Sequence, residues 1–450
     1  MRLAAMVVAA AAAMAFVPVI PAAAVEQPQV VVGSTPLDDP PGPELSTKQN
    51  RGCLGAGVLH DSDLSQPPPP ELALDLRHAR ALSNGAGVTV AVIDTGVTPN
   101  LRLPNLIGGG DYVVPGGDGL SDCDAHGTLI AGIIGAASDP GDAFAGVAPA
   151  ARIISIRSRS DAFDFERPAS FDSAQQSAMD VRTLARAITH AANQGAGVIV
   201  ISLPICVTTT AAVDQSMLAV AIGYAVRTRG AVVVAGAGNT GDPGCQQNPD
   251  IDPTKPADPR NWDGVKTVST PSWFASDVVS VGFTTATGAE VPDSLTGPWV
   301  SVAAPGTGIE SLGPGGGLIN GIGASGSLVP VGGSSFAAAY AAGVAALLRS
   351  RFPAETPGEI VNRLRASAHA PARGVDNAVG AGSIDPMAAL SYRTPPQLPA
   401  GLGSPRTLAM AAPPPSKDAR PGTYALIIIA LAGALALCVV GAEEILRRRE

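Results

Sequence analysis

Charged residues are scarce in this sequence, and they never gather into a long basic run. Lys, Arg, Asp and Glu together make up 15% of the 450 residues, and the formal net charge is −9. A protein that tracks nucleic-acid phosphates needs clustered Lys and Arg side chains. We therefore exclude a nucleic-acid partner, and we expect the surface to depend on Gly, Pro, Ser, Thr and Asn.

Cysteine is also rare, and its spacing does not fit the common zinc motifs. The chain has five cysteines and contains no Cys-x-x-Cys or His-x-x-x-His spacing. We therefore expect no metal and no cofactor. Cys438 falls in a long apolar segment, which leaves Cys53, Cys123, Cys206 and Cys245. In an exported chain these four predict two disulfides, and the sequence permits three pairings.

The N-terminal segment, residues 1–24, has the pattern of a secretory signal peptide. Arg2 precedes an apolar stretch from Leu3 to about Val19, and Pro21 and three alanines provide small residues for cleavage. An uncleaved membrane anchor is the alternative. Export follows from either interpretation.

The C-terminal segment contains a second apolar stretch, residues 424–442, with no charge inside it. Its length is close to the ~20 residues that a transmembrane helix needs. Arg447, Arg448 and Arg449 follow it, so the positive-inside rule predicts a cytoplasmic tail at residues 443–450. The remainder of the chain would then lie outside the membrane, anchored by a single span.

Two Pro-rich segments flank a central region. Residues 25–70 end in four consecutive prolines and show no hydrophobic period, so we expect an extended arm. Residues 393–423 contain eight prolines and predict a semi-rigid stalk. Residues 71–392 are expected to form the folded domain.

Within that domain, short runs rich in Val and Ile alternate with helical segments. Buried strands are predicted at residues 88–93, 153–156, 198–201, 231–235 and 278–281. Helices are predicted at residues 72–82, 126–136, 177–194, 214–228, 335–351 and 357–368. Runs that are apolar on both faces, alternating with helices, predict a doubly wound α/β fold with a mostly parallel sheet.

Three residues with the side chains of acyl-transfer chemistry occupy special positions in this pattern. Asp94 ends a predicted strand, His126 opens a helix, and Ser335 begins the Ala-rich helix. Carboxyl ends of parallel strands and the adjoining helix starts share one sheet edge, so the three should meet in a crevice. A histidine can remove the proton of a serine hydroxyl, and a buried carboxylate holds that imidazole in place. Asn239 follows another strand, and its amide could donate to a developing oxyanion together with a backbone N–H at the helix start.

The motifs around these residues resemble those of subtilisin-like serine proteases, whose order along the chain is Asp, His, Ser. They lie at residues 90–97, 124–128 and 331–337, with supporting motifs at 146–149, 201–203 and 301–306. The resemblance covers about residues 76–390. It implies a subtilisin-like fold, serine endopeptidase activity and a substrate-binding strand that includes Ser202 and Leu203.

The sequence departs from that family in two places. Ser334 stands where the family usually has Thr, and Ala339 where it usually has Pro. Alignment on Ala337 selects Ser335 as the nucleophile, and Ser334 is the alternative. Residues 25–70 are also too short and too Pro-rich for the folded inhibitory pro-domain that subtilisins commonly carry.

The complete layout is similar to that of the mycosins, the membrane-anchored proteases of type VII secretion systems. This resemblance implies protein substrates, a place in the secretion membrane complex and an arm that wraps the catalytic domain. It also implies the disulfides Cys53–Cys123 and Cys206–Cys245. The rival hypothesis is a structural subunit that stabilises the secretion complex, with proteolysis as a secondary activity.

Other polar residues have plainer interpretations. Asp122 and Asp124 are expected to be loop residues, with a calcium site as the alternative. The histidines other than His126 lack a motif, and we expect surface or structural positions for them.

Overall fold

The computed structural model describes residues 25–166, 171–323 and 326–393, together with residues 396, 430 and 433. Residues 1–398 form one compact unit, and residues 399–450 form another. The predicted signal peptide, nearly all of the predicted stalk, the cytoplasmic tail and the predicted span apart from Ala430 and Gly433 lie outside the described residues. In the part of the chain that is described, we find no helix with the length and apolar character needed to cross a membrane.

A parallel sheet forms the centre of the first unit. Its strands follow the order β12-β11-β9-β7-β3-β5-β4, and every neighbouring pair is parallel. The strands are β3 (Thr89–Asp94), β4 (Leu106–Asp111), β5 (Arg152–Arg157), β7 (Val198–Ile201), β9 (Val232–Gly236), β11 (Val278–Thr284) and β12 (Val300–Pro305). This arrangement confirms the predicted α/β fold.

Helices cover both faces of the sheet, because alternate side chains of each strand point in opposite directions. In β3, Val90 and Val92 join one hydrophobic cluster with residues of α4, α7 and α8. Ala91 and Ile93 join a second cluster with residues of α5 and α6. The helices are α4 (His126–Gly135), α5 (Ser173–Asn193), α6 (Ser216–Gly223), α7 (Ser334–Arg351), α8 (Pro357–Ser367) and α9 (Pro386–Ser391).

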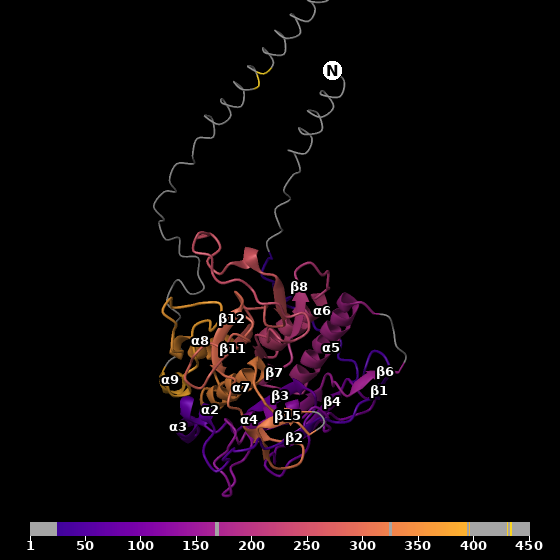
Figure 1. The fold of residues 1–450 in the computed structure, drawn as a ribbon, viewed down its shortest axis with the longest axis vertical. Helices are drawn as coiled ribbons and strands as arrows, with labels where there is room; N and C mark the ends of the chain where they lie inside the picture. The colour runs from indigo at the N-terminus through magenta and orange to yellow at the C-terminus, as the bar shows by residue number, and fades with distance from the viewer. Residues whose placement is uncertain are drawn as a thin grey trace, which may run out of the picture. The chain divides into compact units, whose positions relative to one another are not determined.

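Helix α7 passes through the middle of the domain, beside β7 and β11 (Figure 1). All its residues from 334 to 348 are buried. Small alanine side chains allow the helix to approach the sheet closely. The N-terminus of this helix is therefore fixed within the core.

Two of the predicted helices are each divided into two shorter elements in the structure. The helix predicted at residues 72–82 is two helices, α2 (Pro69–Ala73) and α3 (Leu76–Leu82). They are separated at Asp75, whose φ of 48° lies in the left-handed region and breaks the helical path. The helix predicted at residues 214–228 ends as α6 at Gly223 and continues as a π-helical turn, Tyr224–Thr228.

The arm, residues 25–70, is mostly extended, but it contributes two short strands that the sequence did not predict. Strand β1 (Thr47–Gln49) pairs with β6 (Phe163–Phe165), and β2 (Gly55–Gly57) pairs with β15 (Gly321–Gly323). Further pairs outside the main sheet are β8 (Ile205–Thr208) with β10 (Thr267–Thr270), β13 (Ser311–Leu312) with β14 (Leu318–Ile319), and β15 with β16 (Val329–Pro330).

Polar side-chain contacts also attach the arm to helix α5. His190 lies 2.9 Å from the Asp38 carboxylate, and Arg182 lies 2.8 Å from Glu44. Because these contacts come from different turns of one helix, they hold residues 38–44 of the arm against it. His190 is thus structural, as predicted.

Two disulfides are present among the described residues. Cys53–Cys123 joins the arm to the segment that precedes α4, and Cys206–Cys245 joins β8 to the loop after β9. Of the three pairings that the sequence permitted, this is the one implied by the resemblance to mycosins.

Candidate active site

Asp94 occupies the carboxyl end of β3, between β5 and β7 in the sheet. Its side chain is completely buried. One carboxylate oxygen, Oδ1, accepts a hydrogen bond from the Thr95 backbone N–H at 2.7 Å. The same oxygen lies 2.8 Å from Nδ1 of His126.

His126 is the first residue of α4, and its ring joins the carboxylate to the nucleophile candidate. The other ring nitrogen, Nε2, lies 2.9 Å from Oγ of Ser335. Phe336 packs beside the imidazole with a centroid separation of 5.2 Å. The three side chains expected to converge at this sheet edge therefore form one continuous hydrogen-bonded chain.

Ser335 and its neighbour Ser334 have different surroundings, although both lie at the start of α7. The hydroxyl of Ser334 accepts a hydrogen bond from the Gly238 backbone N–H at 3.0 Å. Only Ser335 lies beside the imidazole. Backbone N–H groups in the first turn of a helix have no partner within the helix, so the N–H of Ser335 can donate to a ligand.

Burial and charge act in opposite directions on this pair. Burial alone would raise the pKa of Asp94, but the His126 charge and hydrogen bonds from His126 and Thr95 hold that pKa below its usual value. Burial alone would lower the pKa of His126, and the Asp94 carboxylate outweighs it and raises that pKa. The site therefore favours an ionised carboxylate and stabilises a protonated imidazole.

Asn239 follows β9, and its side-chain amide lies next to the turn that carries the two serines. Its Oδ1 accepts a hydrogen bond from the Ser334 backbone N–H at 2.9 Å, and its Nδ2 donates to Asp242 at 3.0 Å. Gly333 adopts a φ of +142°, and a Cβ at that position would lie 3.1 Å from Oδ1 of Asn239. The close approach of this backbone to the amide explains the glycine.

Ser202 and Leu203 follow β7 and lie outside the strand that was expected to include them, because β7 ends at Ile201. The two residues differ in exposure. The Ser202 side chain is buried, and its hydroxyl lies near the Asp94 carboxylate. It lowers the pKa of Asp94 although it lies outside normal hydrogen-bonding geometry. Leu203 is partly exposed. Of the two, only Leu203 offers a side-chain surface to a peptide.

Asp122 is a buried residue of the site that the sequence did not identify. Its carboxylate accepts hydrogen bonds from Thr95, Thr128 and the Asp124 backbone N–H. Burial raises its pKa to about 6. It is a loop residue, as expected, and its position four residues before His126 was the only signal for the buried role it has.

The calcium alternative at these aspartates receives no support from the described residues. Asp124 accepts hydrogen bonds from the Ser160 hydroxyl at 2.6 Å and the Asp161 backbone N–H at 3.0 Å. Within the described ranges, no group of three or more His, Cys, Asp or Glu side chains converges on one point.

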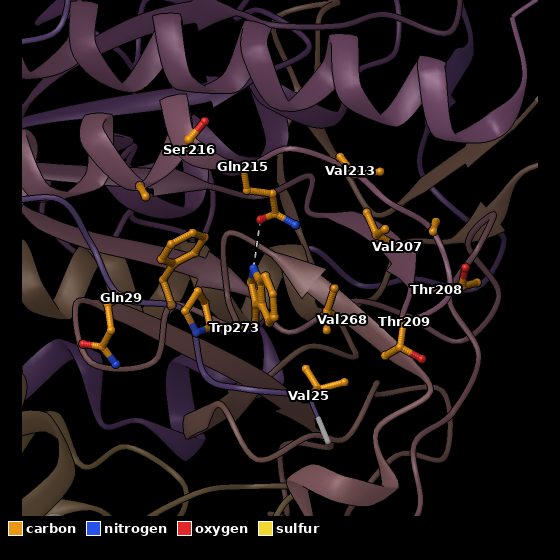
Figure 2. Close-up of a pocket in the computed structure, with 14 residues that line it drawn as sticks. Val25, Gln29, Val207, Thr208, Thr209, Val213, Gln215, Ser216, Val268 and Trp273 are labelled. Carbon is orange, nitrogen blue, oxygen red and sulfur yellow. Dashed lines mark hydrogen bonds between the residues drawn. The ribbon is translucent and has the colours of Figure 1, made fainter. Parts of the chain in front are cut away.

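A separate apolar cavity of about 310 Å³ lies where the arm begins (Figure 2). Val25 and Gln29 of the arm line it, together with Val207, Val268 and Trp273. The indole N–H of Trp273 donates to Gln215 at 2.9 Å. None of the three converging residues, Asp94, His126 and Ser335, lines this cavity.

Known proteins with similar sequences are proteases of the kind that the geometry indicates. Residues 85–382 match the family model described as the subtilase family. Mycosin-1 of Mycobacterium tuberculosis is 44% identical over 440 residues, which covers 97% of this chain and 98% of that protein. Mycosin-3 of the same organism is 44% identical over 429 residues, covering 93% of this chain and 91% of the relative.

Solved structures are similar to the described fold as well. One is the serine protease MycP1, described as an essential component of the type VII (ESX-1) secretion system, with 46% identity and a TM-score of 0.79. It covers 82% of this chain, and all of that protein is matched. Another is a chain in the periplasmic assembly of the ESX-5 inner membrane complex, with 46% identity and a TM-score of 0.80 over 87% of this chain and 100% of that one.

Proposed function

The chain belongs to the subtilase family and, within it, to the mycosins, and on that basis we propose that it is a serine endopeptidase in which Ser335 attacks the peptide carbonyl. The observation that carries this proposal is the hydrogen-bonded chain from Asp94 through His126 to Ser335. Its two links measure 2.8 and 2.9 Å, which is within normal hydrogen-bonding distance.

In the proposed reaction, Nε2 of His126 takes the proton from the Ser335 hydroxyl as its oxygen attacks the carbonyl carbon. Asp94 holds Nδ1 and stabilises the imidazolium that forms. His126 then gives the proton to the leaving amine, and the acyl group stays on Ser335. A water molecule, activated by the same imidazole, hydrolyses this ester and restores the enzyme.

The tetrahedral intermediate carries a negative oxygen that needs hydrogen-bond donors. We assign Nδ2 of Asn239 and the backbone N–H of Ser335 to this task. Both adjoin the first turn of α7, whose dipole favours negative charge. Losing one such donor costs ~10²–10³ in turnover, a figure measured for a subtilisin, a relative in this family.

For the substrates we propose proteins that pass through or assemble with a type VII secretion membrane complex. This part rests on the solved relatives, one described as an essential component of such a system and one found in a periplasmic assembly. The catalytic domain would then be extracytoplasmic. Residues 424–442 would form its single membrane span, with the C-terminus in the cytoplasm.

A second function, as a stabilising subunit of the complex, is favoured by the occurrence of a relative inside the assembled ESX-5 inner membrane complex. The Ser335→Ala variant distinguishes the two functions. If secretion persists after peptidase activity is lost, the stabilising function is the essential one. If secretion stops while the complex still assembles, proteolysis is essential.

The direct test of the chemistry is covalent labelling with a fluorophosphonate probe, which reacts with an activated serine. We expect the wild-type protein and the Ser334→Ala variant to be labelled, and Ser335→Ala and His126→Ala to remain unlabelled. Labelling of Ser335→Ala with loss of labelling in Ser334→Ala would show that the neighbouring serine is the nucleophile.

A further inference from the structure

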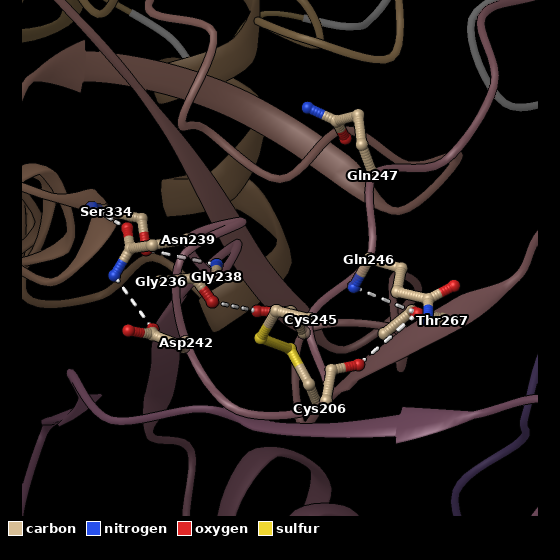
Figure 3. Close-up of a disulfide and its surroundings, with 12 residues drawn as sticks. Cys206, Gly236, Gly238, Asn239, Asp242, Cys245, Gln246, Gln247, Thr267 and Ser334 are labelled. Atoms are coloured by element: carbon tan, nitrogen blue, oxygen red, sulfur yellow. Dashed lines mark hydrogen bonds between the residues drawn. A yellow bond between two sulfur atoms is a disulfide. The ribbon is translucent and has the colours of Figure 1, made fainter.

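The amide of Asn239 is held at both ends (Figure 3). Its Oδ1 accepts a hydrogen bond from the Ser334 backbone N–H, and its Nδ2 donates to Oδ2 of Asp242 at 3.0 Å. An amide nitrogen carries two protons. When the carboxylate takes one of them, the second proton is left for another acceptor and has a fixed direction.

The loop that carries Asp242 is itself fixed. Its backbone N–H donates to the Asn239 carbonyl at 3.1 Å, and its own carbonyl accepts from the Cys245 backbone N–H at 3.0 Å. Cys245 is joined by a disulfide to Cys206 in β8. Figure 3 shows Asp242 beside Asn239, and the disulfide between Cys206 and Cys245. The carboxylate is therefore placed by consecutive turns and a covalent link.

Asn239 is anchored on its other side as well. It forms a bridge with Ser294, and the Thr240 N–H donates to the Asp293 carbonyl at 2.9 Å. The backbone of Asn239 is thus fixed, and rotation of the side chain is the freedom that remains. The Asp242 contact limits that rotation.

We propose that Asp242 is a positioning residue that orients Nδ2 of Asn239 toward the oxyanion. The inference rests on the proposed function, because it needs Asn239 to be an oxyanion donor. A donor oriented before the reaction needs no reorganisation when charge develops, so it stabilises the transition state more than the ground state. A hydrogen bond to an ionised carboxylate is also stronger than one between neutral groups.

The same carboxylate could instead repel the oxyanion. Asp242 is exposed to solvent, however, so the high dielectric of water weakens its repulsion of the oxyanion. The hydrogen bond to Nδ2 is direct and does not depend on that weakening. Orientation therefore outweighs repulsion, and loss of the carboxylate should slow the reaction.

The test follows the rate of fluorophosphonate labelling, because the phosphoryl oxygen of the probe occupies the oxyanion position. For Asp242→Ala we expect the maximal labelling rate to fall about tenfold, a fraction of the ~10²–10³ assigned to a whole donor. The half-saturating probe concentration should stay the same. Asp242→Asn keeps an acceptor oxygen and should recover most of the rate.

The matched control is Asp252→Ala. Asp252 also lies between β9 and β10 and accepts hydrogen bonds from Thr254 within its own turn, without touching Asn239. It should label at the wild-type rate. Thermal unfolding of each variant shows whether a lower labelling rate reflects loss of the fold. The proposal is contradicted if Asp242→Ala unfolds at a lower temperature than wild type and Asp242→Asn does not restore the labelling rate.

Combining Asp242→Ala with Asn239→Ala separates this inference from the proposed function. If Asp242 acts through Asn239, the double variant labels as slowly as Asn239→Ala alone. If both single losses multiply, or if Asp242→Ala labels faster than wild type, the positioning role is wrong. If Asn239→Ala itself labels at the wild-type rate, the assignment of Asn239 as an oxyanion donor is wrong.

Discussion

The Asp122 carboxylate accepts two hydrogen bonds from Thr128, one from the backbone N–H at 2.9 Å and one from the hydroxyl at 2.6 Å. Its other oxygen accepts from the Thr95 hydroxyl at 2.8 Å. The Thr95 oxygen in turn accepts from the Gly127 backbone N–H. One buried side chain thus ties the residue after Asp94 to the residues after His126.

Asp122→Ala should destabilise the protein, because it leaves the buried Thr128 donors without a partner. Each such donor costs roughly 1–3 kcal/mol, so we expect a loss of about 3 kcal/mol in the free energy of unfolding. Urea denaturation measures it. Asp118→Ala is the control, since Asp118 is exposed and accepts one turn hydrogen bond, from Leu120. Equal midpoints for the two variants would refute the prediction.

The decrease of kcat/KM at acid pH should reflect protonation of His126. Its pKa is raised above 6.5, chiefly by the Asp94 carboxylate against the effect of burial. Because the base must be neutral, kcat/KM should increase with pH through a midpoint above 6.5. The raised pKa of His126 also stabilises the folded state. This stabilisation is fully present below the pKa that His126 has in the unfolded chain, and it is lost as pH increases through the pKa that His126 has in the folded protein.

Asp94→Asn should move that midpoint to lower pH, because the amide removes the charge that raises the pKa of His126. The turnover number should also fall by about 10⁴, the loss measured for the equivalent change in another serine protease. Hydrolysis of fluorescently labelled casein over a pH series measures both effects. A midpoint that does not move would show that Asp94 does not control the imidazole.

Gly333→Ala should lower kcat and also destabilise the fold. Its φ of +142° is unfavourable for alanine, and the added Cβ would lie 3.1 Å from Oδ1 and 3.3 Å from Nδ2 of Asn239. The amide must move, so the oxyanion loses an aligned donor. Gly315→Ala is the control, because nothing lies within 4 Å of a Cβ there. Casein hydrolysis at the wild-type rate by Gly333→Ala would contradict this account.

Arg102→Met should destabilise the fold. The Arg102 guanidinium donates to the carbonyls of Ala137 and Phe144 and pairs with Asp142 at 2.6 Å. Its side chain is 12% exposed and that of Asp142 is 17% exposed. Removing one partner of a largely buried pair costs up to about 3–5 kcal/mol, and thermal unfolding measures the effect. Arg152→Met, at an exposed position, should have little effect.

Replacing Cys53 and Cys123 by serine should lower stability and leave the labelling of Ser335 intact. The disulfide spans a sequence separation of 70 residues, for which chain entropy predicts about 4 kcal/mol. Neither sulfur belongs to the hydrogen-bonded chain of the site. Equilibrium unfolding and fluorophosphonate labelling of the same preparation test the two halves of this prediction, and an unchanged unfolding free energy would contradict it.

Several parts of the fold followed directly from local patterns. Residues 198–201 were predicted as a strand with the bounds that the structure has, because four consecutive Val and Ile residues suit a strand covered on both faces. The positions of Asp94, His126 and Ser335 at strand and helix ends predict that the three side chains meet. The shared edge of a parallel sheet made their meeting predictable.

Other parts depend on contacts that no local pattern encodes. Strand β4 contains Gly108, Gly109 and Gly110, so it lacks the Val and Ile signal of its neighbours. Strands β1 and β2 of the arm form only because distant partners offer free edges. The contacts of Asp122 and Asp242 arise from loop geometry, and a sequence read residue by residue gives no direction for a side chain in a loop.

The order in which the arm finds its partners has a consequence for biosynthesis. Leu59 donates its backbone N–H to Asn320, a residue 261 positions later in the chain. Translation therefore completes most of the domain before this part of the arm can make its contact with Asn320. Contacts of such long range slow folding, and a nascent arm with unpaired strands is open to proteolysis in the meantime.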